Sequence, residues 1–381
     1  MRIVRVANFV NPRSGGLRTA LSHLGAGYLA AGHEPVLVVP GPAESDEVTE
    51  QGRVITLPGP LMPGMGGYRV LLDRGRLSSA LQALRPDRLE VSDRSTLRWL
   101  GRWAKRREVP SMMVSHESLD GLLRLFGPGV GRRAGDLLNA RTAAGHDQVV
   151  CTTQWAASEF ARLGVRNLTR VPLGVDLERF TPANRDPAMR TRWCAAGDVL
   201  LLHCGRLSPE KRPRRSLEAL AALRRSGVPA VLVVAGGGPM RSALQSEAAD
   251  RGLPVRFLGH LTDPAKLSSL LATADVAMAP GPIETFGLAA LEALASGTPV
   301  VVSSESALPE VIGDAGVAAS GEGPAFAEAV RTLLSRPESA RRSAARAQAE
   351  LYPWDRSVAG FLAAHRVPAA ATSQPFSESM R

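Results

Sequence analysis

Short runs of apolar residues alternate along this chain with longer stretches in which apolar residues return every three or four positions. The short runs predict buried parallel strands, and the longer stretches predict helices that cross from one strand to the next. Leu17, Leu21, Leu24, Tyr28 and Leu29 give the first of these helices a one-sided apolar face. In the first half of the chain the predicted strands are 3–7, 35–39, 54–57, 88–91, 111–115, 149–152 and 169–172.

A second series of apolar runs begins after the polar segment 184–187, which has the composition of a linker. The predicted strands of this series are 199–204, 230–235, 255–258, 276–279, 300–303 and 317–319. The alternation predicts an α/β fold with two doubly wound parallel sheets, in domains that span 1–182 and 188–350, and a ligand cleft between the carboxyl ends of their strands. Residues 353–366 have a helical pattern, and the composition of 367–381 predicts a disordered tail.

The composition narrows the class of protein. The apolar content of 44% is that of a globular chain, and no apolar run reaches the roughly 18–20 residues that a membrane-spanning helix needs. Cys151, Cys194 and Cys204 are an odd number without metal-ligand spacing, which argues against a disulfide framework or a zinc site. The first residues do not have the pattern of a signal peptide. We therefore expect a reduced, cytoplasmic protein.

Two glutamates, Glu284 and Glu292, flank the start of a predicted helix, 288–295. The turn and helix start between them contain Thr285, Phe286, Gly287 and Leu288. Unpaired N–H groups and partial positive charge at a helix start bind phosphate, and each carboxylate can accept hydrogen bonds from sugar or ribose hydroxyls. The arrangement fits a nucleotide sugar. In the alternative interpretation Glu284 only caps the helix and Glu292 lies on a solvated face.

Arg206 and Lys211 follow the first predicted strand of the second domain, at the end of the strand where a diphosphate would bind. Arginine engages phosphate oxygens with two donors, and lysine supplies a compact charge. Together they are predicted to stabilise the negative charge that grows on a departing nucleoside diphosphate. Since the sequence contains no Asp-x-Asp motif, we predict a site without metal.

Glycine-rich turns follow strands in both domains and can bring the backbone close to the same ligand. Gly237 and Gly238 follow the strand 230–235, and Gly15 and Gly16 lie between the first strand and the first helix. A plain tight turn is the alternative for each pair. The turn in the first domain lacks the Gly-x-Gly-x-x-Gly pattern, so a nicotinamide-dependent dehydrogenase is not expected.

The motifs, in this order, resemble those of the family-4 retaining glycosyltransferases, which have the two-domain GT-B fold. The resemblance implies that Glu284 holds the donor sugar, that Glu292 holds the ribose, and that Arg206 and Lys211 clamp the diphosphate. It also implies that the backbone near Leu258 holds the base, that transfer proceeds with retention, and that the helix in 353–366 crosses back onto the first domain.

His116 ends the predicted strand 111–115. A histidine at this place in related transferases contacts the donor sugar, which implies a catalytic or sugar-positioning role, and Glu117 beside it is placed to tune its protonation. A structural histidine is the alternative. Glu90 and Asp93, at the end of an earlier strand, are weaker candidates for the acceptor pocket.

The first domain, at 7–19 and 89–94, is most similar to the phosphatidylinositol dimannoside mannosyltransferases of actinobacteria, a branch of the same family. This similarity implies GDP-mannose as donor and an anionic inositol glycolipid as acceptor, which would be converted from dimannoside to trimannoside. The alternative is a UDP- or dTDP-sugar transferred to a different lipid or small molecule, because acceptor loops diverge on a shared fold.

The net charge of +10 is unevenly placed, with 23 basic and 15 acidic side chains in residues 1–175 against 23 and 21 in the remainder. Trp99 and Trp103 lie among arginines, and the apolar stretch 122–126 precedes two more. Such segments can lie in the headgroup layer of an anionic membrane, although an ordinary helix with its tryptophans packed inward is the alternative. We predict reversible contact with the inner face of the cell membrane. Nucleic-acid binding is not expected, since its motifs are missing.

Overall fold

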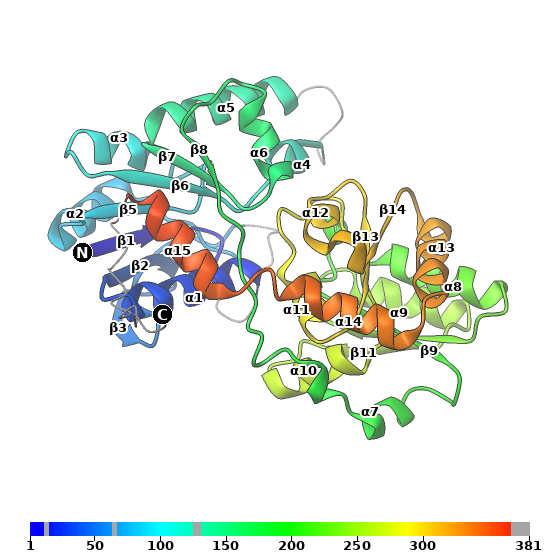
Figure 1. Ribbon diagram of the computed structural model, residues 1–381. Coiled ribbons are helices and arrows are strands. Elements are labelled where there is room, and N and C mark those ends of the chain that lie inside the picture. The colour runs from blue at the N-terminus through cyan, green and yellow to red at the C-terminus, as the bar shows by residue number, and fades with distance from the viewer. Residues whose placement is uncertain (11–14, 63–66, 125–130, 367–381) are drawn as a thin grey trace, which may run out of the picture.

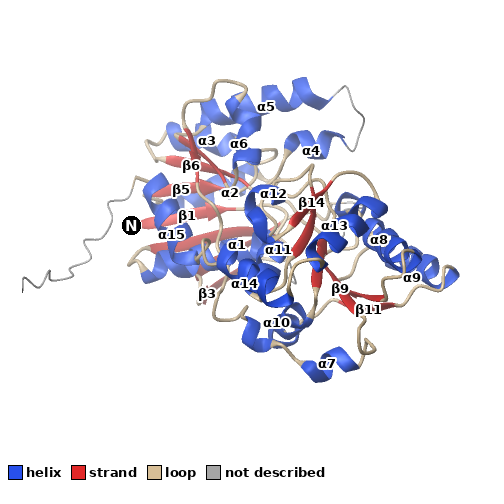
Figure 2. Cartoon of the chain, turned by 45° about the vertical axis from the view of Figure 1, so that its right-hand side comes forward, coloured by secondary structure: helices blue, strands red, loops and turns tan. Residues whose placement is uncertain are grey.

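The computed structural model describes residues 1–10, 15–62, 67–124 and 131–366. Two sheets, one from each half of the chain, occupy opposite halves of the molecule (Figure 1). Helices lie on both sides of the strands in each half (Figure 2). The predicted tail 367–381 and the end of the apolar stretch, 125–126, lie outside the described residues.

The first sheet has the strand order β3-β4-β2-β1-β5-β6-β7-β8. Its neighbouring strands are parallel except at the edge, where β3 pairs antiparallel with β4. The strands are β1 (Arg2–Val6), β2 (Glu34–Gly41), β3 (Ser45–Thr49), β4 (Gly52–Pro58), β5 (Arg88–Val91), β6 (Ser111–Ser115), β7 (Gln148–Cys151) and β8 (Leu168–Arg170). The helices of this half are α1 (Gly16–Ala30), α2 (Arg74–Leu84), α3 (Trp99–Lys105), α4 (Leu119–Arg124), α5 (Gly131–Gly145) and α6 (Gln154–Ala161).

The second sheet is parallel throughout and has the order β11-β10-β9-β12-β13-β14. Its strands are β9 (Val199–Cys204), β10 (Ala230–Ala235), β11 (Val255–Gly259), β12 (Val276–Ala279), β13 (Val300–Ser303) and β14 (Val317–Ala319). The helices of this half are α7 (Pro187–Thr191), α8 (Arg214–Arg225), α9 (Arg241–Asp250), α10 (Pro264–Thr273), α11 (Leu288–Ala295), α12 (Leu308–Ile312), α13 (Gly323–Leu334), α14 (Glu338–Ala349) and α15 (Trp354–Ala364).

Burial of the strands on both faces explains why they form continuous apolar runs rather than alternating ones. In β1, Val4 and Val6 belong to the core beneath α2 and α3, whereas Ile3 belongs to the core with α1. The strands therefore supply apolar side chains to two layers of helices, and their carboxyl ends are left as the edge on which a site can be built.

Two details of the predicted pattern are wrong. The apolar pattern does not predict β3, because this strand has a single valine, Val48, whose side chain is 88% exposed at the sheet edge. Leu29, assigned to the apolar face of α1, is 47% exposed. The buried stripe of that helix is formed by Leu21, Leu24 and Tyr28, and Leu29 lies just outside it.

The last helix, α15, leaves the second half of the chain and packs against α1 of the first half (Figure 1). The crossing is close, since a methyl group on Gly27 would lie 2.3 Å from a side-chain carbon of Val358. The Ser357 hydroxyl donates a hydrogen bond to the carbonyl of Pro172. The end of the chain thus completes the core of the first domain.

Glu90 is buried beneath α15 and does not line a pocket, so the weaker prediction for this residue is wrong. Its carboxylate lies 3.5 Å from Nε of Arg5 and accepts a hydrogen bond of 3.0 Å from the Tyr28 hydroxyl. His365 Nε2 lies 3.4 Å away on the other side. Burial alone would raise the pKa of Glu90, but the charge of Arg5 and these hydrogen bonds outweigh it and lower the pKa to about 2.

Of the two tryptophans in α3, Trp103 packs inward, as in the alternative to membrane contact, whereas Trp99 does so only partly. Trp103 is buried, and its indole N–H donates a hydrogen bond of 2.8 Å to the Ser78 hydroxyl of α2. Trp99 is half-buried, and the guanidinium group of Arg74 lies 5.7 Å from its ring centre. Trp103 is thus not available to a membrane. Over the ranges that the structure describes, no helix has the length and apolar character needed to span a bilayer.

Candidate active site

The loop before α11 joins the two domains at the carboxyl ends of their strands. The Thr285 hydroxyl donates a hydrogen bond of 2.7 Å to the carbonyl of His116, which follows β6. In return, the hydroxyl of Thr153, at the start of α6, donates a bond of 2.9 Å to the carbonyl of Thr285. The structure therefore brings His116 and the predicted donor loop, which lie far apart in the sequence, to one place.

Lys211 and Glu284, assigned to the diphosphate and the sugar respectively, form an ion pair with one another. Lys211 ends the short helical turn after β9, and Glu284 lies in the loop before α11. Both side chains are partly exposed, 34% and 23% respectively. The pair holds each group at the cleft. A sugar diphosphate that binds there must exchange this contact for its own phosphate and hydroxyl groups.

Arg206 lies on the loop after β9, and its guanidinium group is 5.1 Å from the ring centre of Tyr68 in the first domain. The backbone of this loop is held against the glycine-rich turn after β10, because Leu207 N–H donates a bond of 2.9 Å to the carbonyl of Gly237. A methyl group on Gly238 would lie 2.3 Å from the carbonyl oxygen of Leu207. Glycine is required at Gly238 by this close approach, whereas Gly237 has no atom nearby that excludes a side chain.

The N-termini of α1 and α11 lie close together. A methyl group on Gly16, the first residue of α1, would lie 3.6 Å from the side chain of Leu288, the first residue of α11. Gly15 precedes α1 with φ at 119° and is exposed. Each helix start offers unpaired N–H groups and partial positive charge. Two such helix ends close to one another form a setting for a diphosphate.

Gly287 caps α11 in the left-handed conformation, with φ at 79°. A methyl group there would lie 2.2 Å from the Leu308 side chain, so no other residue fits without displacement. Phe286 beside it is buried, with its ring 5.9 Å from that of Tyr352. The side chain of Phe286 therefore belongs to the core, and only its backbone faces the predicted donor site. Leu258 is half-buried in β11 at the sheet edge.

The side chains of His116 and Glu117 can both carry a charge. Burial disfavours the charged form of each and shifts both pKa values. Burial lowers the pKa of His116 to about 4, although Glu90 opposes the shift, so the imidazole is neutral at neutral pH. Its Nε2 is buried without a hydrogen-bond partner in the described part of the chain. Burial raises the pKa of Glu117 to about 7, with help from the charge of Asp93. This pair offers a polar face to a ligand without a fixed charge.

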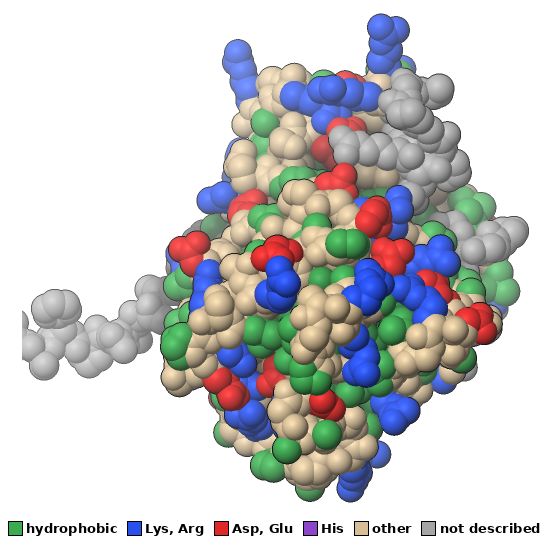
Figure 3. All heavy atoms as spheres, turned by 90° about the vertical axis from the view of Figure 1, so that its right-hand side faces the viewer, with side chains coloured by type: hydrophobic (Ala, Val, Ile, Leu, Met, Phe, Trp, Pro, Cys, Tyr) green, Lys and Arg blue, Asp and Glu red, His purple; other side chains and the backbone are tan. Residues whose placement is uncertain are grey.

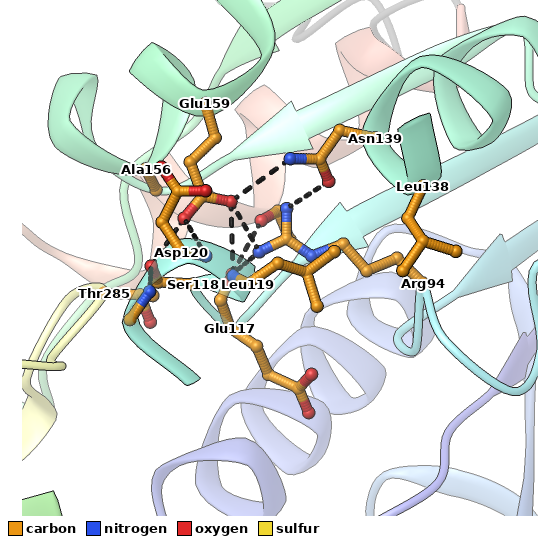
Figure 4. A network of polar contacts seen from close by, with 12 residues as sticks. Arg94, Glu117, Ser118, Leu119, Asp120, Leu138, Asn139, Ala156, Glu159 and Thr285 are labelled. Atoms are coloured by element: carbon orange, nitrogen blue, oxygen red, sulfur yellow. Dashed lines mark hydrogen bonds and ion pairs between the residues drawn. The ribbon is translucent and has the colours of Figure 1, made fainter. Parts of the chain in front are cut away.

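A buried network behind these residues fixes the loop that carries them (Figure 4). Arg94 Nη2 lies 3.1 Å from the Glu159 carboxylate, which in turn accepts N–H bonds of 3.3 Å and 3.2 Å from Leu119 and Asp120 at the start of α4. Arg94 also donates to the Glu117 carbonyl. The carboxyl group of Glu117 points away from the network (Figure 4).

Glu292 lies in α11, about one turn after the first residue of the helix. It is near Cys204 at the end of β9. Burial raises its pKa to about 7, opposed by the charge of Arg179. The same carboxyl group contributes to the raised pKa of Cys204, which burial shifts to about 12. Glu292 is thus not on a solvated face, and it is poised to lose its proton when a hydroxyl donor arrives.

Tyr68, Glu159 and Glu310 belong to this site although the sequence patterns do not single them out. Glu310, in α12, accepts N–H bonds of 2.7 Å from Gln154 and 3.2 Å from Trp155 at the start of α6. Glu159 and Glu310 lie outside the glycine-rich segments, and Tyr68, although it follows the glycine-rich segment 64–67, does not come after a predicted strand. A threonine at position 153, before α6, is a sequence signal for a helix start. No sequence signal indicates that its hydroxyl bonds to Thr285 of the other domain.

Two α/β domains built on parallel sheets, with the carboxyl ends of their strands joined at this loop, have the architecture of a glycosyltransferase with the GT-B fold, and family comparisons agree. The model described as "Glycosyl transferase 4-like domain" matches residues 15–176, and that described as "Glycosyl transferases group 1" matches residues 194–350. The chain belongs to this family of glycosyltransferases. A GDP-mannose-dependent alpha-(1-6)-phosphatidylinositol dimannoside mannosyltransferase of Mycobacterium tuberculosis is 52% identical over 369 residues, which are 95% of each chain.

Solved structures share the fold at low sequence identity. A sucrose-phosphate synthase from Thermosynechococcus elongatus has a TM-score of 0.76 at 20% identity, over 96% of this chain and 98% of its own. An Anabaena protein in complex with UDP and glucose has a TM-score of 0.74 at 17% identity, over 95% and 98%. These likenesses confirm the predicted two-domain α/β architecture.

Proposed function

We propose that this enzyme transfers mannose from GDP-mannose to a phosphatidylinositol dimannoside, giving the trimannoside with retention of the anomeric configuration. The observation that carries the proposal is the 52% identity to the mycobacterial mannosyltransferase. The identity extends over 95% of both chains and so includes the first domain as well as the donor domain. A shared donor domain alone would identify the reaction type and leave the acceptor open.

In the proposed reaction the leaving group is GDP, and negative charge grows on its β-phosphate as the bond to mannose breaks. Lys211 and Arg206 stabilise that charge, together with the N-termini of α1 and α11. Glu284, released from Lys211 by the phosphates, accepts hydrogen bonds from the mannose hydroxyls. Glu292 holds the ribose, and neutral His116 contacts the sugar face. Closure of the domains around these groups excludes water.

We propose that this stabilisation needs no metal ion, because two cationic side chains and two helix ends supply positive charge where a diphosphate binds. Transfer is then expected to continue in the presence of excess EDTA at its rate without chelator. Loss of activity on chelation, restored by a divalent cation, would contradict this part of the proposal.

We further propose that the enzyme works at the inner face of the cell membrane, where a glycolipid acceptor presents its headgroup. The domain that carries His116 has an excess of basic side chains, which favours an anionic surface. Contact with the membrane is reversible in this proposal.

The test is to incubate the purified protein with labelled GDP-mannose and a lipid extract that contains phosphatidylinositol dimannoside. We expect label in a single lipid with the mass of the trimannoside, and stabilisation against heat by GDP but not by UDP or dTDP. Label that enters only from a UDP- or dTDP-sugar, or that enters a different acceptor, would overturn the assignment.

A further inference from the structure

Arg215, near the start of α8, is a buried arginine in the second domain. On the outer face of this domain, basic and acidic side chains are interspersed (Figure 3). Arg214, the preceding residue, has a side chain that is 62% exposed and pairs with Glu247. The side chain of Arg215 is only 7% exposed. Because a guanidinium group stays charged when it is buried, its removal from water has to be compensated by hydrogen bonds.

Three hydrogen bonds hold this guanidinium group in one orientation. Nε and Nη2 donate bonds of 3.0 Å each to the two carboxylate oxygens of Glu322, the residue before α13. Nη1 donates a bond of 3.2 Å to the main-chain carbonyl of Pro280. The ring centre of Phe326 lies 5.8 Å from the guanidinium carbon. Since the guanidinium group is planar, its two bonds to Glu322 fix the direction in which Nη1 points.

The carbonyl that Arg215 binds belongs to the first residue of the loop before α11. Pro280 follows β12 directly, and the loop between β12 and α11 contains Glu284. Gly281 is packed on the turn that carries Lys211, since a methyl group on this glycine would lie 3.2 Å from the Lys211 Cα. The bond from Arg215 therefore holds the loop where it begins and where it contacts that turn.

Arg215 is thus connected to both members of the ion pair between Lys211 and Glu284. It lies in the helix that follows the Lys211 turn, and it holds the loop that carries Glu284. In the proposed reaction these two side chains bind different parts of one donor, so their separation has to match the donor. A displacement of about 1 Å in a site of this kind can lower the rate by about 10²-fold.

We propose that Arg215 is a positioning residue for donor binding, which sets the place of the Glu284 loop relative to Lys211 through its bond to the Pro280 carbonyl. Glu322 acts through Arg215, because its carboxylate orients the guanidinium group. The inference rests on the proposed function, in which Lys211 binds the diphosphate of the donor and Glu284 binds its sugar.

The test compares R215K with R214K, a change in the exposed neighbour. Lysine keeps the positive charge but has no planar group of donors, so it cannot form the two parallel bonds to Glu322 together with the bond to Pro280. Calorimetry measures the affinities for GDP and for GMP, which lacks the second phosphate. In R215K the GDP affinity is expected to fall by about tenfold and the GMP affinity to stay within about twofold. A role in stability alone would weaken both nucleotides equally.

Steady-state rates with GDP-mannose supply a second measurement. We expect kcat of R215K to fall by at least about tenfold, because Glu284 is displaced from the sugar. R214K should keep the wild-type kcat and the wild-type ratio of GDP to GMP affinity.

Glu322→Gln is a further variant, whose side chain is 59% exposed and whose replacement leaves the core intact. It should lower the ratio of GDP to GMP affinity by a smaller factor than R215K, and R215K/E322Q should lower it no further than R215K does. Equal losses of GDP and GMP affinity in R215K, or an unchanged ratio in either single variant, would overturn the proposal. Binding of UDP in place of GDP by the wild type would contradict the proposed donor alone, and the same ratio is then measured with UDP and UMP.

Discussion

Lys211 and Glu284 form an ion pair with each other, and under the proposed function a donor would have to replace this contact. Exposed or half-exposed ion pairs contribute little to stability, so this contact is easily exchanged. In the proposed reaction a donor brings its phosphates to the lysine and its sugar hydroxyls to the glutamate. Separate removal of the two residues should therefore affect different steps.

Replacement of Lys211 by alanine removes a preorganised cation from the leaving diphosphate. We expect kcat to fall by about 10²–10³-fold, the effect of losing one such transition-state donor, with little change in thermal stability. Steady-state rates with GDP-mannose measure it. Lys266→Ala removes an exposed lysine of α10 in the same domain and should leave kcat unchanged; near-normal turnover by the Lys211 variant would refute the clamp.

Because the pKa of Glu292 is raised, we expect donor binding to depend on pH. Its pKa is about 7 in the free protein because burial disfavours the charged form, while ribose hydroxyls donate to the ionised form. The affinity for GDP should therefore rise as the pH increases to about 7 and then level off. Calorimetry between pH 5.5 and 8.5 measures the profile (both limits are about 1.5 units from that pKa). A Glu292→Gln variant should bind more weakly with a flatter profile, whereas Glu117→Gln, which removes the other carboxyl group with a pKa of about 7, should keep the slope.

Among the elements, α11 depends on one glycine for its start. Gly287 and Gly32 share nearly the same backbone angle, with φ at 79° and 78°. An alanine at Gly32 would meet no atom within 4 Å, whereas at Gly287 it would meet Leu308 at 2.2 Å.

Gly32→Ala is thus expected to destabilise the fold by about 1 kcal/mol, the effect of the left-handed conformation alone. Gly287→Ala should destabilise it by more, with weaker GDP binding, because the clash displaces the helix start. Chemical denaturation of both variants separates the two contributions. Equal free energies of unfolding would show that the contact with Leu308 has no effect.

Glu90 is buried between the strands of the first sheet and the end of α15, where it contacts His365. Since its pKa is lowered to about 2 in the folded protein, Glu90 stabilises the fold above its unfolded pKa of about 4.3, and this contribution is lost as the pH falls toward 2. Glu90→Gln leaves Arg5 buried without a counter-ion, which should destabilise the protein by about 3–5 kcal/mol at pH 7.

Urea unfolding at pH 7 and pH 3 tests this expectation, since the difference between wild type and variant should shrink at the lower pH. Glu34→Gln, which removes the partner of Arg2 in an exposed ion pair, should change stability by no more than about 1 kcal/mol. Equal effects of the two variants would contradict a structural role for the buried pair.

The elements of the fold were predictable where local pattern decides them. Continuous apolar runs located the parallel strands, and the Gly-Thr-Pro stop after Ala295 located the end of α11. β3 was not predictable, because its residues are mostly exposed and polar, and only its pairing with β4 makes it a strand. The ion pair of Lys211 with Glu284 and the stacking of Arg206 on Tyr68 join residues that are distant along the chain, and no periodicity reveals such contacts.

At the scale of the whole molecule, the contacts between the domains include several hydrogen bonds at the carboxyl ends of the strands. Thr285 bonds to His116 and Thr153, and Glu310 bonds to the start of α6. Polar contacts of this kind can be exchanged when domains move relative to one another, and under the proposed function donor binding at the same place should favour the closed arrangement.

Thr285→Val removes the hydroxyl that bonds to the His116 carbonyl and keeps the shape of the side chain. We expect the free variant to populate a more open arrangement, with a larger radius of gyration in small-angle scattering, and KM for the donor to rise several-fold. GDP should restore the wild-type radius. An unchanged radius together with an unchanged KM would show that this hydrogen bond does not bias closure.

The crossing of α15 has a consequence for synthesis on the ribosome. The first domain emerges from the ribosome long before residues 354–364, so the surface of α1 around Gly27 and the side of Glu90 that contacts His365 stay uncovered until that segment has been made. A nascent first domain would therefore stay incomplete until residues 354–364 have emerged, and the same domain expressed alone would expose that surface of α1. A circular permutant that begins with residues 353–366, linked to Met1, would supply the missing helix first and let the domain mature without the rest.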